Sequence, residues 1–334
     1  MTDTAISERA RKLYADALIW DTHSGFMPDP AADLNNLRIW RDAGINYLSI
    51  DVGFDLMPWQ NTVKTLAAFR RWVLAHPDHY RLVTNVDEIV EAKAQGKLAI
   101  TFDIEGMNAL DGRIEMVEFY HHLGVRQMLF AYNRNTLAGG GCHDDDTGLT
   151  AFGRQVIDEM NRLGMFVDVT HCGHRTSMEV MEYSNQPVIF SHSNAKALAG
   201  HGRNIADDQI RACAKTGGVV GIVGINFFLG DDNATSERLA DHVDHLLDVA
   251  GPDHVGIGLD FAFPVDMEGI DEIIANNPQF WPKNEGYGAK PTVYAKPAQL
   301  AEMTEILLKR GHSDQTVVKV LGQNFFNLAK KVWK

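Results

Sequence analysis

The chain has 334 residues, of which 45% are hydrophobic and 22% charged, so it is an ordinary globular protein with a large core. Its 31 basic and 44 acidic residues leave a net charge of −13, which argues against nucleic acid or an anionic membrane as a partner. No stretch approaches the roughly 18 apolar residues that span a bilayer, and the polar start lacks a signal-peptide core. The cysteines Cys142, Cys172 and Cys213 are too few and scattered for a disulfide framework, so we expect a cytoplasmic protein.

Short apolar runs alternate with amphipathic segments along most of the chain. Amphipathic segments with helical spacing include 63–74, 115–122, 150–163, 174–183 and 238–249, and the tail predicts helices over 298–307 and 314–334. The runs have the length and β-branched content of buried parallel strands: 17–20, 47–52, 98–104, 126–132, 165–170, 188–190, 219–225 and 255–259.

Eight strand and helix units favour a closed (β/α)₈ barrel, of the TIM type, over an open sheet. We expect a single domain over 1–334, with a core from about 15 to 330, because no linker or repeat divides the chain. A Gly- and Asp-rich loop at 138–146 and a long insertion at 263–296 both follow strands. Both should therefore hang over the C-terminal mouth of the barrel.

Two histidines each close a strand-like run. His171 ends the run Met165-Phe166-Val167-Asp168-Val169-Thr170, and His192 ends Pro187-Val188-Ile189-Phe190-Ser191. Polar residues at the carboxyl ends of parallel strands lie where α/β proteins place their chemistry. A single such histidine is more often structural, but two in succession predict imidazoles that converge on a metal ion.

Other polar residues at strand ends complete this set. The first run leads into His23, the third ends at Glu105, the fourth at Tyr132, and the eighth at Asp260. Imidazole and carboxylate at one mouth suit a zinc-type ion with a position left for water. Glu105 could bridge two ions, and Asp260 could take a proton from water.

Simpler interpretations remain open for several of these residues. Glu105 and Asp260 could each cap a following helix. Arg203 could clamp a substrate carboxylate or pair with surface acids. His143, in the Asp-rich loop, could belong to a cation site, although a solvated acidic loop is the more ordinary interpretation.

Several motifs resemble the membrane (renal-type) dipeptidase family, metallopeptidases of the amidohydrolase superfamily, from about residue 15 to 330. The most specific are Asp168-Val169-Thr170-His171 and Pro187-Val188-Ile189-Phe190-Ser191-His192-Ser193. The others are Arg203-Asn204 with Asp207-Asp208, Gly148-Leu149-Thr150 with Phe152-Gly153, Met160-Asn161-Arg162-Leu163-Gly164, Gly256-Ile257-Gly258-Leu259-Asp260-Phe261, and Gly322-Gln323-Asn324.

The resemblance implies a (β/α)₈ barrel with a binuclear zinc site that cleaves dipeptides, and it suggests a homodimer. Glu105 would bridge the two ions, and His23 would bind the first. His171 and His192 would complete the shell of the second. Arg203 would hold the substrate carboxylate, and Asp260 would handle the proton of the water.

Two positions depart from the family pattern. The first motif of the family is His-x-Asp, whereas this chain has His23-Ser24-Gly25, so the first ion loses a carboxylate ligand. That site should be weak or empty, or should recruit another ligand such as Asp21. The histidine that would polarise the scissile carbonyl is Tyr132 here, and a tyrosine hydroxyl can still donate to an oxyanion.

The sequence therefore predicts a metal-dependent hydrolase of dipeptides or related small amides with a free carboxylate, acting through metal-bound water. Asp260 would be the base, Tyr132 would stabilise the oxyanion, and Tyr132, Asp260 and Arg203 would contact the substrate. Two alternatives are a divergent barrel with a non-peptide amide substrate and a non-catalytic protein that binds a metal or small molecule. Gly25 and Tyr132 motivate both.

Overall fold

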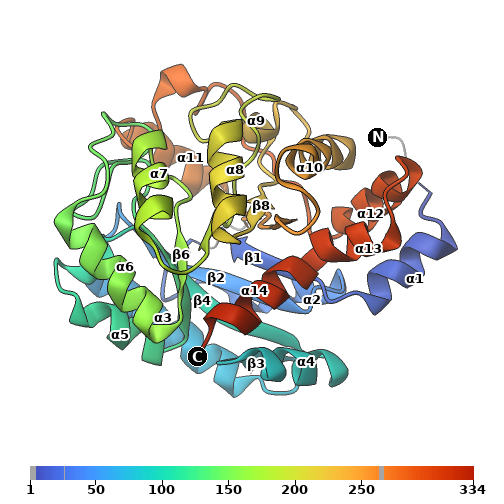
Figure 1. Ribbon diagram of the computed structural model, residues 1–334. Helices are drawn as coiled ribbons and strands as arrows, with labels where there is room; N and C mark the ends of the chain where they lie inside the picture. Colours follow the sequence, from blue (N-terminus) through green and yellow to red (C-terminus); the bar gives the residue numbers. More distant parts are fainter. Residues whose placement is uncertain (1–4, 26, 263–266) are drawn as a thin grey trace.

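The apolar runs form parallel strands in the computed structural model, which describes residues 5–25, 27–262 and 267–334 (Figure 1). One sheet joins, in this order, β1 (Trp20–Ser24), β2 (Tyr47–Phe54), β4 (Leu98–Glu105), β5 (Val125–Leu129), β6 (Phe166–Asp168) and β7 (Val188–Ile189). β8 (Val220–Ile222) and β9 (Val255–Ile257) form a second parallel pair.

Backbone hydrogen bonds join the sheet and the pair into a closed barrel. Between β7 and β8, Gly221 N donates to Phe190 O at 2.7 Å. Between the end of β9 and β1, Asp260 N donates to His23 O at 3.2 Å. The predicted (β/α)₈ fold is therefore confirmed.

The closure depends on two glycines. A Cβ atom on Gly221 or on Gly258 would lie 2.0 Å from the carbonyl oxygen of Ser191, which is far inside van der Waals contact. A residue with a side chain at either position would push the end of β7, and hence His192, away from its neighbours.

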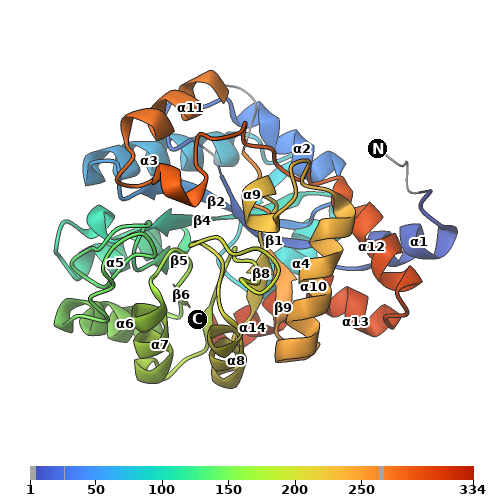
Figure 2. The same cartoon turned by 90° about the horizontal axis from the view of Figure 1, so that it is seen from above.

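Helices surround the strands, as Figure 2 shows from above. The outer ring includes α3 (Trp59–Ala75), α5 (Glu115–His122), α6 (Ala151–Leu163), α7 (His174–Tyr183), α8 (Asp207–Thr216) and α10 (Ser236–Ala250). The remaining helices are α1 (Glu8–Asp16), α2 (Arg38–Asp42), α4 (Val86–Ala94), α9 (Asn226–Leu229), α11 (Met267–Asn276), α12 (Gln299–Lys309), α13 (Asp314–Val318) and α14 (Asn324–Val332).

Some element boundaries differ from the predictions. The first strand begins at Trp20, where the run at 17–20 ends, because Trp20 stacks on Tyr47 of β2 with ring centroids 3.6 Å apart. His23 therefore lies within β1 rather than after it. A short extra strand, β3 (Tyr80–Leu82), pairs with β4 outside the ring, and three residues are too few for a recognisable pattern. The predicted tail helix is interrupted by a π-helical segment at Lys319–Gln323.

Residues 263–266 of the predicted insertion lie outside the described ranges. The rest of it, 267–296, lies over the barrel mouth. Trp281 and Tyr287 pack in a cluster with Ile225 and Phe228, and Phe54 and Tyr132 border that cluster. Among the described helices, each is too short or too polar to cross a bilayer.

Candidate active site

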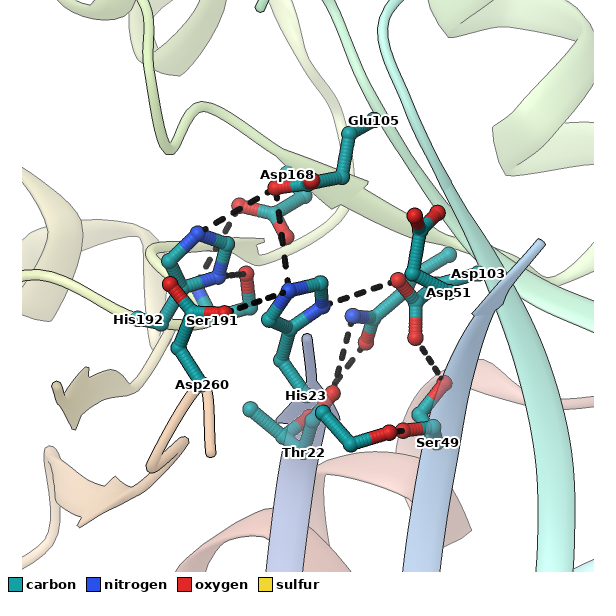
Figure 3. A network of polar contacts seen from close by, with 12 residues as sticks. Thr22, His23, Ser49, Asp51, Asp103, Glu105, Asp168, Ser191, His192 and Asp260 are labelled. Carbon is teal, nitrogen blue, oxygen red and sulfur yellow. Dashed lines mark hydrogen bonds and ion pairs between the residues drawn. The ribbon is translucent and has the colours of Figure 1, made fainter. Parts of the chain in front are cut away.

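Polar side chains from several strand ends converge at the mouth of the barrel (Figure 3). Gly25, Asp51, Glu105, His171 and Asp260 line one central cavity. His23 and His192 are fully buried beneath it, with stacked rings 4.0 Å apart. Residues from six different strands or strand ends thus meet in one place, as the fold predicts for this face of a barrel.

His23 presents one ring nitrogen to this cluster. Its Nδ1 lies 2.9 Å from Asp103 Oδ1, and Ser49 donates to the other oxygen of that carboxylate. An anionic acceptor places the ring hydrogen on Nδ1, which leaves Nε2 with a free lone pair. Nε2 is buried and has no hydrogen-bond partner among the described residues, and it lies 3.7 Å from Glu105 Oε1 and 3.5 Å from Asp260 Oδ1.

His171 and His192 present the same nitrogen from the other side of Glu105. Their Nδ1 atoms lie 2.6 Å from Asn133 Oδ1 and 2.9 Å from Ser191 Oγ, respectively. Their Nε2 atoms are 3.1 Å apart and lie 3.2 and 3.4 Å from Glu105 Oε1. Such partners orient imidazoles that act as metal ligands.

Asp168 explains why the two histidines lie side by side. Its Oδ1 accepts hydrogen bonds from Thr170 N at 2.9 Å and from Ser191 N at 3.2 Å, so it ties the end of β6 to the end of β7. The aspartate of the Asp-x-x-His pattern therefore fixes the position of the following histidine through these backbone hydrogen bonds.

Three site residues have left-handed backbone conformations although none is glycine. The φ angles are +65° for His171, +53° for Asp260 and +60° for Asn133. This conformation is costly for a residue with a side chain and tends to persist where function requires a particular geometry. The backbone is strained where the side chains converge.

Electrostatics at the site favour a bound cation. Burial raises the pKa of Glu105 to about 8, although His23 opposes this. Burial lowers the pKa of His171 and of His192 well below the ordinary value, with nearby positive charge adding to the effect. Burial also lowers the pKa of His23, but the carboxylates of Asp103 and Glu105 outweigh it and raise that pKa well above 6.5. The neutral imidazoles of His171 and His192 beside the Glu105 carboxyl are therefore ready to bind a divalent cation, whereas His23 would release a proton as it binds one.

In the part of the chain that the structure describes, two groups of ligand atoms are close enough to hold an ion. Glu105, His171 and His192 form one group, and His23, His192 and Asp260 form the other, with all ligand atoms of a group within 4.8 Å of one another. The orphaned Nε2 of His23 and the converging nitrogens fit a zinc-type ion, which prefers nitrogen and carboxylate donors.

Tyr132 lines the same cavity. Its ring stacks on His171 with centroids 4.3 Å apart, and its backbone nitrogen donates to Asp55 Oδ2 at 2.9 Å. Burial raises the pKa of the hydroxyl well above 10, so the group remains a hydrogen-bond donor at neutral pH.

Arg203 is buried behind His192 and forms no ion pair among the described residues. Its Nη2 donates to His192 O at 3.2 Å, the guanidinium lies 5.2 Å from the centre of the Phe228 ring, and Nε has no partner in the described part of the chain. It lines a neighbouring cavity that shares His171 with the central one. The surface-acid interpretation of Arg203 is therefore wrong, and an unused donor is available.

Other residues considered from the sequence have structural roles. Both oxygens of Asp21 are engaged, by Trp40 Nε1 at 3.0 Å and by Leu259 N at 2.9 Å. In the Asp-rich loop, Asp144 accepts from a backbone nitrogen at 3.0 Å, and so does Asp146. His143 bonds the hydroxyl of Tyr287 at 3.1 Å instead of joining these carboxylates.

Sequence reasoning missed three residues that shape the site: Asp51, Asn133 and Ser49. Asp51 and Ser49 lie within the predicted strand at 47–52, two residues apart, and their polarity inside an apolar run was the available signal. No pattern marked Asn133, because its contact with His171 joins segments 38 residues apart.

Comparisons with known proteins agree with this geometry. Residues 11–276 match the family model described as membrane dipeptidase, peptidase family M19. A protein of Schizosaccharomyces pombe named as an uncharacterized dipeptidase is 34% identical over 241 residues, which are 68% of this chain and 57% of that protein. The dipeptidase tcpJ of Claviceps purpurea is 28% identical over 82% of this chain and 60% of its own length. The chain thus spans less than two thirds of the length of these curated relatives.

A solved structure resembles almost the whole chain. An amidohydrolase from Pseudomonas aeruginosa superposes with a TM-score of 0.85 and 28% identity, over 97% of this chain and 99% of that one. Since the family model and a relative above 30% identity each cover most of the chain, this protein belongs to the membrane dipeptidase family, peptidase family M19.

Proposed function

We propose that this protein is a metal-dependent hydrolase that cleaves dipeptides or related small amides with a free carboxylate. The observation that carries the proposal is the convergence of three imidazole Nε2 atoms on Glu105 Oε1, at 3.7 Å for His23, 3.2 Å for His171 and 3.4 Å for His192. Membership of a dipeptidase family supports the substrate class. Zinc suits this donor set best.

Each residue near the cavity has a proposed task. Bound divalent ions would polarise the scissile carbonyl and lower the pKa of water at the site. Asp260, which lines the cavity and is 18% exposed at its side chain, would accept the proton and return it to the leaving amine. The hydroxyl of Tyr132 would donate to the oxygen that gains negative charge.

Arg203 would bind the carboxylate of the substrate. Its guanidinium is buried, so a charged hydrogen bond there is stronger than one at the surface. Because Arg203 lines the cavity adjoining the central one, the substrate would extend past His171 to reach it.

The rest of the cavity wall indicates which side chains fit. The wall is mainly apolar and aromatic, with Phe54, Ile225, Phe227, Ile274 and Trp281 among its residues. We expect dipeptides with apolar side chains to be cleaved faster than those with charged ones, because a charged group would lose its hydration there.

A dipeptide panel tests the proposal. The purified chain would be loaded with zinc or with manganese and assayed against dipeptides of both stereochemistries and against N-acyl amino acids. Hydrolysis should depend on the metal, and Glu105→Gln should abolish it while the fold persists. The complete failure of every amide with both metals would favour the non-catalytic alternative.

A further inference from the structure

Asp51 is a buried carboxylate at the site that the proposed mechanism does not use. It is 2% exposed and lines the central cavity together with Gly25, Glu105 and Asp260. Among the described residues, the hydrogen bond that it accepts comes from Gly53 N, 3.0 Å from Oδ1. A buried carboxylate normally needs either several donors or a cation.

Strand pairing places Asp51 beside Gly25. Ser24, the last residue of β1, pairs with Ile50 of β2, so the residues that follow this pair along the chain are Gly25 and Asp51. Asp51 also pairs with Asp103 of β4, beside which Figure 3 draws it. Asp51 therefore lies on the strand next to β1, at the level of Gly25, where the family has a carboxylate and this chain has no side chain.

Alternation along the strands aims Asp51 into the barrel. Ser49 points inward, because its hydroxyl donates to Asp103, which in turn holds His23. Residues two apart on a strand face the same side, so Asp51 shares the face of Ser49, and Gly25 shares that of His23.

A carboxylate at position 25 itself has no free room. A Cβ atom there would lie 2.6 Å from Asp260 Oδ1 and 3.4 Å from the Cβ of Ala262. Asp260 thus occupies the space above Gly25, 3.5 Å from His23 Nε2, and Asp51 lines the same cavity from the adjoining strand β2.

The net charge of the side chains around the central cavity favours two bound divalent cations over one. With metal bound, the carboxylates of Asp51, Asp103, Glu105 and Asp260 would be ionised and opposed by the guanidinium of Arg203, while the histidines must be neutral to act as ligands. One divalent ion would leave a net negative charge in a buried site, whereas two would leave a net positive charge that suits an anionic substrate.

We propose that Asp51 supplies the carboxylate ligand that Gly25 lacks, to an ion held by His23 and Glu105. The inference rests on the proposed metal-dependent function and deepens it. It replaces the expectation of a weak first site with two ions of comparable affinity per chain.

Metal analysis of the full-length chain tests this. Wild type, Asp51→Asn and the matched control Asp21→Asn would be stripped of metal and dialysed against a series of buffered free zinc concentrations. Bound zinc would be counted by mass spectrometry, and circular dichroism would monitor the fold. Anomalous diffraction from zinc-loaded wild type would locate the ions without any variant.

We expect two ions in wild type and in Asp21→Asn, whose carboxylate is engaged by Trp40 and Leu259. Asp51→Asn should keep one ion and bind the second at least about 100-fold more weakly. In the crystal, an oxygen of Asp51 should lie about 2.0–2.2 Å from one ion.

The outcomes separate this inference from the proposed function. One ion in wild type, two equally tight ions in Asp51→Asn, or a crystal in which Asp51 touches no ion would overturn the role of Asp51, whatever the activity. Should Asp51→Asn fail to fold, the crystal decides. Two ions with Asp51 as a ligand, but no hydrolysis of any amide, would uphold the inference and refute the proposed hydrolase.

Discussion

Substituting Asp103 by asparagine should weaken the ion that His23 binds. Asp103 is fully buried, with Oδ1 2.9 Å from His23 Nδ1 and Oδ2 bonded by Ser49. Asparagine has the same shape but no charge. If its NH₂ group faces His23, the ring hydrogen must move to Nε2, which then cannot bind a metal. If the amide faces the other way, the hydrogen stays but the anionic partner is lost.

The size of the effect follows from either orientation. A charged hydrogen bond contributes about 1–2 kcal/mol more than a neutral one, and loss of such a partner typically weakens a metal site about 10- to 100-fold. We expect the affinity of the ion on His23 to fall by that factor. The ion on His171 and His192 should be little changed, because their Nδ1 atoms bond Asn133 and Ser191 instead.

Stability of the metal-free protein should fall as well. Without metal, burial lowers the pKa of His23, but the carboxylate of Asp103 together with Glu105 outweighs it and raises that pKa well above 6.5. The side chains of His23 and Asp103 then form an ion pair with Nδ1 2.9 Å from Oδ1. Removing the carboxylate leaves the charged imidazole without that partner, so metal-free Asp103→Asn should unfold below the wild-type temperature.

Zinc titration against a competing chelator and thermal unfolding followed by circular dichroism measure the two effects. Unchanged affinity for both ions would refute the assignment of His23 as a ligand through Nε2. An unfolding temperature of the metal-free variant at or above that of wild type would refute the stabilising role of the His23–Asp103 pair.

Three further predictions concern single sites. His192→Ala should lose metal and on the order of 10²-fold in rate, since its imidazole belongs to both ligand groups, and unchanged metal content by mass spectrometry would contradict this. His242 is fully buried, and burial lowers its pKa to about 4 from 6.5. Its contribution to the free energy of unfolding is therefore complete above pH 6.5 and is lost as the pH falls toward 4, because the unfolded chain takes up the proton first. That contribution is about 3 kcal/mol, and His242→Gln should flatten the pH dependence of the unfolding free energy in urea between pH 6.5 and 4; an identical slope would count against it. Gly258→Ala should cost about 3 kcal/mol or more, because its Cβ would meet Ser191 O at 2.0 Å, whereas Gly200→Ala, with nothing within 4 Å, should be neutral in the same denaturation assay.

The strands and helices of the barrel could largely be predicted from the periodicity of hydrophobic residues in the sequence. Buried parallel strands are short apolar runs, and helices have a period near 3.6, so eight runs with helices between them predict the fold class without any long-range information. Three predicted helices matched closely for this reason: α5 (Glu115–His122) and α7 (His174–Tyr183) have the bounds expected, and α6 (Ala151–Leu163) begins one residue later than expected. The predicted positions of His171 and His192 at strand ends follow from the same local signal.

The arrangement around those strand ends depended on contacts between distant segments. The pairing that puts Asp51 beside Gly25 joins β1 to β2, and the bond from His23 to Asp103 spans 80 residues, so neither leaves a trace in local spacing. The sequence by itself determined which residue types are available at the barrel mouth, because strand ends are encoded locally. Only the tertiary structure decided which nitrogens face Glu105 and which carboxylates are free to meet a metal, because those choices depend on strand register and side-chain direction across the closed barrel.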